Sequence, residues 1–189
     1  IEEEAKVSLK LMKIAEENEI PILLSTKSDR ISKNPWKNII NSIAKNDLIV
    51  VQVSISSLSK SDLEPRAPPP IKRLESLSSI ESPKILRFKL QPFIPNYSLK
   101  DPEEFVEKVS EFGIQQITVE MIRIEREELE YYRSFWEKWN PYSFEGNLIK
   151  AEAPEILREL SLACRKYGLD FGLCKEGYFD LETANCCRM

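Results

Sequence analysis

Residues 48–73 hold the densest set of side chains from which a binding site could be built. An apolar run ends in the hydroxyl residues Ser54, Ser56 and Ser57, and Leu-Glu-Pro-Arg-Ala-Pro follows at 63–68. Prolines fix φ and lack an amide donor, so this turn is expected to be a rigid ledge that opens a helix. Ligands of α/β proteins bind just past the carboxyl ends of strands, which is where the ledge is predicted to lie.

Polar side chains are also predicted at the ends of the neighbouring strands. Lys27 follows a short apolar strand predicted at 21–26, and Gln91 lies at the end of another predicted at 84–92. This mixture of hydroxyls and charges suits a zwitterionic ligand that carries a carboxylate and a ribose. The candidate binding residues are Lys27, Ser54, Arg66 and Gln91.

Three of these candidates also have a plainer structural interpretation. A lysine after a strand is commonly a solvated loop residue, and Lys27 fits that description. Ser54 would serve as a small core residue bonded to the backbone, and Arg66 would brace the turn by pairing with Glu64. Position in the sequence therefore indicates a site but does not name a reaction.

The order of elements predicts an α/β fold. Strands are expected at 21–26, 48–56, 84–92, 115–121 and 169–173, and helices at 3–19, 125–138 and 153–167, after Asn34, after the ledge and after Asp101. Alternating strands and helices imply parallel strands with right-handed crossovers. We expect a partial βα barrel rather than a doubly wound sheet, because no Gly-rich nucleotide turn follows a strand and the chain has only 5 glycines.

The chain divides into three predicted parts. Residues 1–124 form the partial barrel, 125–168 a helical segment packed on it, and 169–189 a Cys-rich tail. The dense aromatic run at 131–142 is interpreted as core and lid packing, with a base-stacking platform as the alternative.

The tail carries most of the cysteines. Cys174, Cys186 and Cys187 lie there, and the last two are adjacent, so they would bridge each other only with strain. Because the chain has no histidine, thiolates would have to supply the soft ligands of zinc or an iron–sulfur cluster. These three are the candidate metal ligands, whereas Cys164 falls on an apolar helix stripe and is interpreted as a core thiol.

Composition sets the broad class of the protein. The chain has 189 residues, 42% hydrophobic and 31% charged, which is typical of one globular domain. Its net charge of −4 does not favour sequence-independent nucleic-acid binding. No signal peptide or membrane-spanning run is visible, so a cytoplasmic protein is expected. The absence of histidine excludes Ser-His and Cys-His catalysis.

Three segments together resemble the radical S-adenosylmethionine superfamily. They are Ser-Thr-Lys at 25–27, Val-Ser-Ile-Ser-Ser at 53–57 and Leu-Glu-Pro-Arg-Ala-Pro-x-x-x-x-Arg-Leu at 63–74. The branch they resemble is that of spore photoproduct lyase and the "DNA repair photolyase" proteins. Pro-Phe-Ile-Pro at 92–95 and the Cys-rich tail are similar to that branch too, and the resemblance covers about residues 5–123 plus the tail.

The resemblance implies a six-stranded partial barrel, of which this chain would hold strands three to six. Such enzymes bind a four-iron four-sulfur cluster through a CxxxCxxC loop and cleave S-adenosylmethionine to a radical that abstracts hydrogen. It implies cofactor contacts from Lys27 and Ser54, then from Arg66 and the backbone at Gln91, and a nucleic-acid substrate. CxxxCxxC is absent from these residues. Cluster ligands are therefore expected upstream of Ile1, in a longer protein, and this chain alone should not generate the radical.

Two other functions are compatible with the same residues. One is a non-catalytic metal-binding or interaction module that uses Cys174, Cys186 and Cys187 structurally. The other is a phosphate-binding βα enzyme that uses Lys27 and Arg66. The oligomeric state stays open, although exposed strand edges favour a partner.

Overall fold

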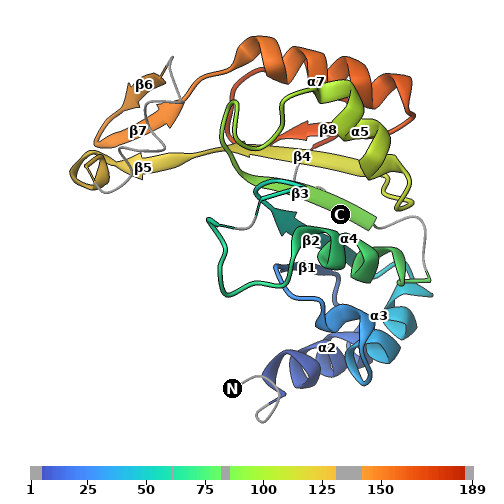
Figure 1. Cartoon of the computed structure of the whole chain (residues 1–189). Helices are drawn as coiled ribbons and strands as arrows, with labels where there is room; N and C mark the ends of the chain where they lie inside the picture. Colours follow the sequence, from blue (N-terminus) through green and yellow to red (C-terminus); the bar gives the residue numbers. More distant parts are fainter. Residues whose placement is uncertain (1–5, 61, 82–85, 131–141, 186–189) are drawn as a thin grey trace.

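A parallel sheet in sequential order forms the centre of the molecule. The computed structural model describes residues 6–60, 62–81, 86–130 and 142–185. The sheet contains β1 (Ile22–Thr26), β2 (Ile49–Ile55), β3 (Leu86–Phe93), β4 (Gln116–Met121) and β8 (Asp170–Leu173), in the order β1-β2-β3-β4-β8. All four pairings are parallel (Figure 1). The predicted α/β class and its five parallel strands are therefore found, with ends that differ by a few residues.

The strand order bears on the two architectures considered for the fold. A doubly wound sheet reverses its strand order at a switch point, and the described strands of this sheet contain no reversal. A sequential order is what an arc of a βα barrel requires. The partial barrel itself, with these strands as its third to sixth, stays a prediction.

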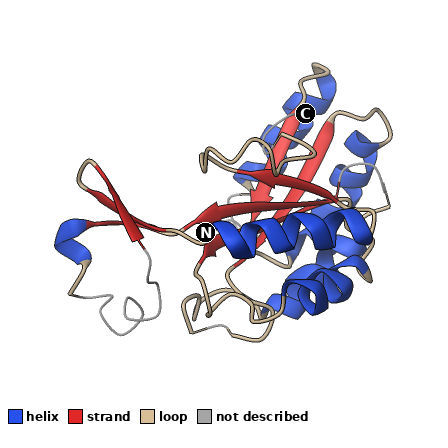
Figure 2. Ribbon diagram, turned by 90° about the horizontal axis from the view of Figure 1, so that it is seen from above, coloured by secondary structure: helices blue, strands red, loops and turns tan. Residues whose placement is uncertain are grey.

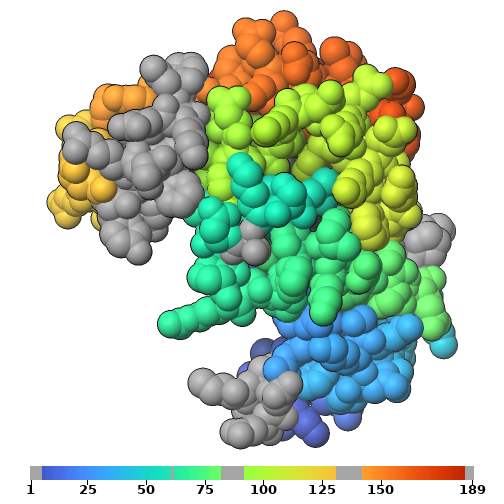
Figure 3. Space-filling model, in the orientation of Figure 1, coloured from blue at the N-terminus to red at the C-terminus, as the bar shows by residue number. Residues whose placement is uncertain are grey.

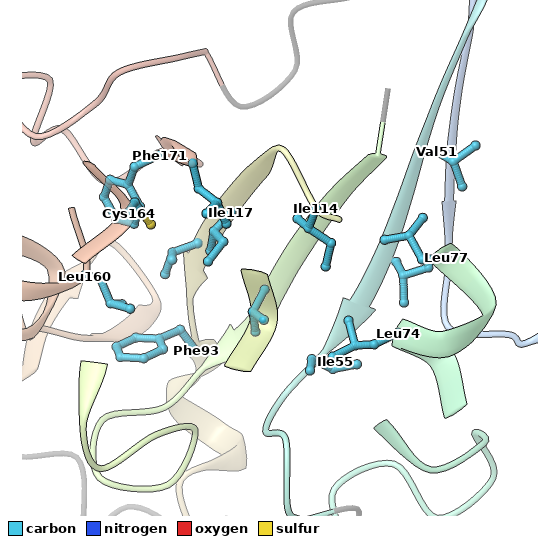
Figure 4. Close-up of a cluster of buried hydrophobic side chains, with 14 of the residues drawn as sticks. Val51, Ile55, Leu74, Leu77, Phe93, Ile114, Ile117, Leu160, Cys164 and Phe171 are labelled. Carbon is cyan, nitrogen blue, oxygen red and sulfur yellow. The ribbon is translucent and has the colours of Figure 1, made fainter. Parts of the chain in front are cut away.

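Helices before and between the strands pack against the sheet. They are α2 (Val7–Glu17), α3 (Trp36–Ala44), α4 (Pro70–Ser78), α5 (Pro102–Ser110) and α7 (Pro154–Lys166). Figure 4 shows α4 presenting Leu74 and Leu77 to Val51 and Ile55 of β2. All seven residues of β2 are buried, as its continuous apolar sequence predicts for a central parallel strand.

Both ends of α5 lie where the sequence signals predict them. Asp101 caps α5, because its carboxylate accepts hydrogen bonds from the amides of Glu103 and Glu104 at 2.9 and 3.0 Å. Gly113 follows that helix with a φ of +70°, a conformation that other residues rarely adopt. This predicted boundary is confirmed.

A second, antiparallel sheet replaces part of the predicted helical segment. It consists of β5 (Arg123–Glu125), β6 (Tyr142–Glu145) and β7 (Leu148–Ala151), in the order β5-β7-β6. It projects from the main body in Figure 2. The helix predicted from residue 125 is wrong at its start, where β5 and a 3-10 turn at Arg126–Glu128 lie. Residues 131–141, with most of the aromatic run, lie outside the described residues.

Gly146 explains the hairpin that the sequence reading missed. Glu145 pairs with Leu148, so Gly146 and Asn147 form a two-residue turn, and the φ of Gly146 is +62°. Gly-Asn between two alternating runs is a hairpin signal. Of the helices that the structure describes, none is long and apolar enough to cross a membrane.

Candidate functional site

The buried carboxylate of Glu64, on the proline ledge, forms ion pairs with two cations near the ends of β1 and β2. Glu64 Oε1 lies 2.5 Å from Lys27 Nζ, and Glu64 Oε2 lies 2.7 Å from a terminal guanidinium nitrogen of Arg73. The side chain of Glu64 is 5% exposed, and that of Arg73 is 0% exposed. Lys27 keeps 44% of its side chain exposed, so its ammonium is the solvent-facing member of the cluster.

Arg73 fixes the ledge against the end of β2. Its Nε donates to the carbonyl oxygen of Pro68 at 2.7 Å, and another guanidinium nitrogen donates to the carbonyl oxygen of Ser54 at 2.8 Å. One fully buried guanidinium thus joins Glu64, the ledge and β2. The ledge is held rigidly by this network in addition to its prolines.

The charges in this cluster do not balance. Burial of Glu64 opposes its ionisation, yet hydrogen bonds and charge from Arg73 and Lys27 hold the pKa of its carboxyl below the ordinary value. One carboxylate therefore faces two cations, which leaves one positive charge in excess at the strand ends. Because Arg73 is enclosed, that excess is available at Lys27, where an anionic group of a ligand would be attracted.

The structure brings two of the four predicted binding residues together. Thr26, the last residue of β1, pairs with Val53, and Lys27 and Ser54 directly follow these two residues in the sequence. Arg66 is exposed, and the predicted Arg66–Glu64 brace is wrong, since the arginine that pairs with Glu64 is Arg73.

Gln91 falls at an irregular point of β3. It lies between Leu90 and Phe93, where the pairing register with β4 shifts. The backbone of Gln91 belongs to β3, and its side chain is not among those that the structure describes. Its predicted contact with a cofactor stays a prediction.

Buried polar atoms line β2 close to the cluster. Gln52, Ser54 and Ser56 alternate with the apolar residues that face α4, so they lie on the other face of the sheet. Gln52 is 3% and Ser56 0% exposed, and Gln52 Oε1 and Ser56 Oγ have no hydrogen-bond partner among the described residues. Unsatisfied buried acceptors of this kind are costly and call for a ligand or water.

A second buried carboxylate ties the two sheets together. Glu176 Oε1 accepts from the amide of Met121 and from Arg123, both at 3.0 Å, and Oε2 lies 2.8 Å from Lys150 Nζ. Glu176 follows β8, Arg123 begins β5 and Lys150 belongs to β7. Its side chain is completely buried, so this cluster is a structural junction rather than an open site.

The cysteines are separated into different environments. Cys164 is fully buried in α7 near Phe171, as predicted for a core thiol (Figure 4), and burial, with the charge of Asp170, raises its pKa to about 12. Cys174 is buried just after β8. Cys186 and Cys187 lie outside the described residues. Among the residues that are described, no three Cys, His, Asp or Glu side chains form a group able to hold a metal.

Two cavities accompany these clusters. One of about 230 Å³ lies where the loops after β2 and β3 meet α5, and it contains residues from Ser57 to Lys60 and from Tyr97 to Asp101. A larger one of about 680 Å³ lies between α5 and α7, which are neighbours at the surface in Figure 3. It is lined mainly by carboxylates and lies apart from Glu64, so it adds nothing to the strand-end cluster.

Sequence reasoning missed Arg73, a residue of the site, and Glu176, the centre of the structural junction. Arg73 stands in the segment Pro-x-x-x-x-Arg-Leu after the ledge, so its spacing was visible. Its position one helical turn inside α4 makes it the arginine that can reach back to Glu64. Glu176 carries no local signal, because its partners come from strands more than 20 residues away.

Comparison with known proteins finds a viral relative whose description names no function. No family model matches the chain, and no solved structure matches it. The chain is 34% identical over 102 residues to a protein described as "Uncharacterized protein ORF301" of Acidianus two-tailed virus. The match covers 49% of this chain and 34% of the viral protein, so the chain corresponds to about a third of that relative's length.

Proposed function

We propose that this chain is part of a radical S-adenosylmethionine enzyme and that the Lys27–Glu64–Arg73 cluster binds the cofactor. The observation that carries the proposal is the arrangement of two cations around one buried carboxylate at the ends of β1 and β2. Lys27 would take the carboxylate of S-adenosylmethionine. The viral relative's description names no activity, so it adds no support for or against this function.

The residues present fit the amino-acid and ribose parts of the cofactor. Glu64 and Arg73 leave one uncompensated positive charge at the half-exposed ammonium of Lys27, which suits a carboxylate. The hydroxyl of Ser54 lies on the neighbouring strand end, and the unsatisfied hydroxyl of Ser56 is two residues further. A ribose hydroxyl can both donate to and accept from such groups. When bound, the cofactor would supply hydrogen-atom abstraction.

The residues present do not fit the iron–sulfur cluster of such enzymes. The chain has no CxxxCxxC, and no three ligands are grouped in the part of the chain that the structure describes. The function proposed for this chain is therefore the binding of S-adenosylmethionine alone. A metal centre at Cys174, Cys186 and Cys187 and a nucleic-acid substrate stay predictions of the resemblance.

The proposal is tested by calorimetric titration of S-adenosylmethionine into the purified chain. Replacing Lys27 with alanine or methionine removes one charge-assisted hydrogen bond, which is worth about 1.5–3 kcal/mol and predicts an affinity loss of about tenfold or more. Lys33→Ala is the matched control, because Lys33 is also exposed and ion-paired, with Asp29 at 2.9 Å. Its affinity should stay unchanged.

Two outcomes would contradict the proposal. Equal affinity in wild type and Lys27→Ala would remove Lys27 from the site. Failure to bind S-adenosylmethionine at millimolar concentration, together with binding of zinc or iron, would favour the non-catalytic metal-binding module.

A further inference from the structure

The cavity next to α5 has an apolar floor and a basic rim. Leu58, Leu99, Phe105 and the ring of Tyr97 supply its apolar surface. Its basic and hydroxyl residues are Ser57, Ser59, Lys60, Ser98, Lys100 and Lys108. The cavity thus combines a place for a small organic group with several donors for an anion.

The three lysines of the rim are not neutralised within the described structure. None of Lys60, Lys100 and Lys108 has a carboxylate within ion-pair distance among the described residues. Lys60 instead lies over the ring of Tyr97, with its ammonium 4.4 Å from the ring centroid. That contact holds the ammonium at the cavity wall.

Two of the nearby carboxylates accept hydrogen bonds from neutral donors. Asp101 accepts the two amide hydrogen bonds that cap α5. Asp62 accepts a hydrogen bond from the phenol of Tyr97. Glu104 is the remaining acidic residue of the cavity and is exposed. The cavity is thus lined by three lysines and by the two carboxylates of Asp101 and Glu104, which leaves one positive charge in excess.

We propose that this cavity binds the phosphate of a small phosphate monoester, such as a sugar phosphate or a nucleotide. Lys60, Lys100 and Lys108 would share the charge of a dianionic phosphate, and the exposed hydroxyl of Ser59 would donate to one of its oxygens. The floor around Tyr97 would pack against the attached sugar. A volume of about 230 Å³ is small for a drug-sized ligand but accommodates a phosphate with one attached sugar.

This site is separate from the proposed cofactor site and does not depend on it. It uses none of Lys27, Glu64 or Arg73. It also differs from the phosphate-binding function considered from the sequence, which relied on Lys27 and Arg66. Neither Lys27 nor Arg66 lines this cavity, so the two phosphate hypotheses use different residues.

The test is an NMR titration of the isotope-labelled chain with inorganic phosphate and with ribose 5-phosphate. Amide shifts should concentrate at residues 57–60 and 97–101, and ribose 5-phosphate should bind more tightly than phosphate. Exposed ion contacts each change affinity by a few fold, so Lys60→Ala/Lys100→Ala/Lys108→Ala together should weaken both ligands about tenfold or more. S-adenosylmethionine, which has no phosphate, should not displace them.

A matched triple variant and Lys27→Ala complete the experiment. Lys10, Lys13 and Lys45 are exposed lysines remote from the cavity, and their replacement by alanine should leave phosphate affinity within about twofold. Lys27→Ala should retain phosphate binding even if S-adenosylmethionine binding is lost or never detected. Equal losses in the two triple variants would overturn the site. Tighter binding of a single-stranded oligonucleotide than of ribose 5-phosphate would overturn the assignment to a small ester.

Discussion

The carboxylate of Glu64 lies 2.7 Å from the guanidinium of Arg73, and neither side chain has more than 5% of its surface exposed. Glu64 belongs to the proline ledge and Arg73 to the first turn of α4, so the pair closes the connection between β2 and the helix that follows it. The carbonyl oxygens of Ser54 and Pro68 accept the other donors of the same guanidinium. A buried ion pair whose other donors are satisfied fixes the positions of both side chains. Because Glu64 also pairs with Lys27, the Arg73–Glu64 pair helps to position Lys27.

Removing Arg73 should destabilise the protein strongly. Arg73→Ala leaves Glu64 buried beside Lys27 alone and removes a donor from each of two carbonyl oxygens. Breaking a buried pair in this way costs about 3–5 kcal/mol of unfolding free energy. Urea denaturation followed by circular dichroism measures the loss. Arg66→Ala, on the exposed side of the same ledge, should change stability by less than about 0.5 kcal/mol. Similar effects of the two substitutions would contradict the assigned role of Arg73.

Stability should also fall at acid pH because of Glu64. Although burial opposes ionisation, Arg73 and Lys27 hold the pKa of the folded carboxyl below its ordinary value of 4.5. A lowered folded-state pKa contributes stability that is present above the unfolded value and is lost as pH falls through the folded one. The unfolding free energy of wild type should therefore decline below about pH 4.5 more steeply than that of Glu64→Gln. Parallel curves for the two proteins between pH 3 and 7 would show that Glu64 is not the responsible group.

The parallel sheet could be predicted from the sequence because each strand is a short segment rich in apolar residues that lies between boundary signals. Asp101 with Pro102 begins α5, and Gly113 ends it, so these limits depend on local chemistry alone. The antiparallel sheet was missed for the opposite reason. β5 and β6 are short, they pair only with β7 among the described strands, and the hairpin turn at Gly146 lies within the segment that was predicted to be helical.

Part of the candidate site could also be predicted from the sequence, and part could not. Lys27 and Ser54 were found because parallel strands put their carboxyl ends at one edge, whichever side chains they carry. The choice of Arg66 over Arg73 failed because it relied on nearness in sequence to Glu64. Arg73 lies nine residues after Glu64, in the first turn of α4. The turn of the chain between them brings the Arg73 side chain back to Glu64.

Glu176 should control how firmly the antiparallel sheet is attached. Glu176→Gln keeps the size of the side chain but removes the charge that Arg123 and Lys150 share in a largely enclosed space. We expect a loss of about 3 kcal/mol and faster amide hydrogen exchange across residues 148–151. Glu145→Gln is the control, because Glu145 is 65% exposed and lies 3.4 Å from Arg123. It should cost less than about 0.5 kcal/mol, and equal exchange rates in both variants would contradict the junction.

Cys164 should be chemically inert in the folded protein. Its side chain is completely buried in α7, and burial, helped by the negative charge of Asp170, raises the pKa of the thiol to about 12. Only the thiolate is alkylated, and at pH 8 a thiol of that pKa is ionised in about one molecule in ten thousand. Iodoacetamide treatment of the native chain, followed by peptide mass mapping, should leave Cys164 unmodified, whereas treatment in concentrated urea should modify it fully. Modification of native Cys164 at a rate close to that of the unfolded chain would mean that α7 leaves the sheet readily, and it would contradict the packing of this thiol in the core.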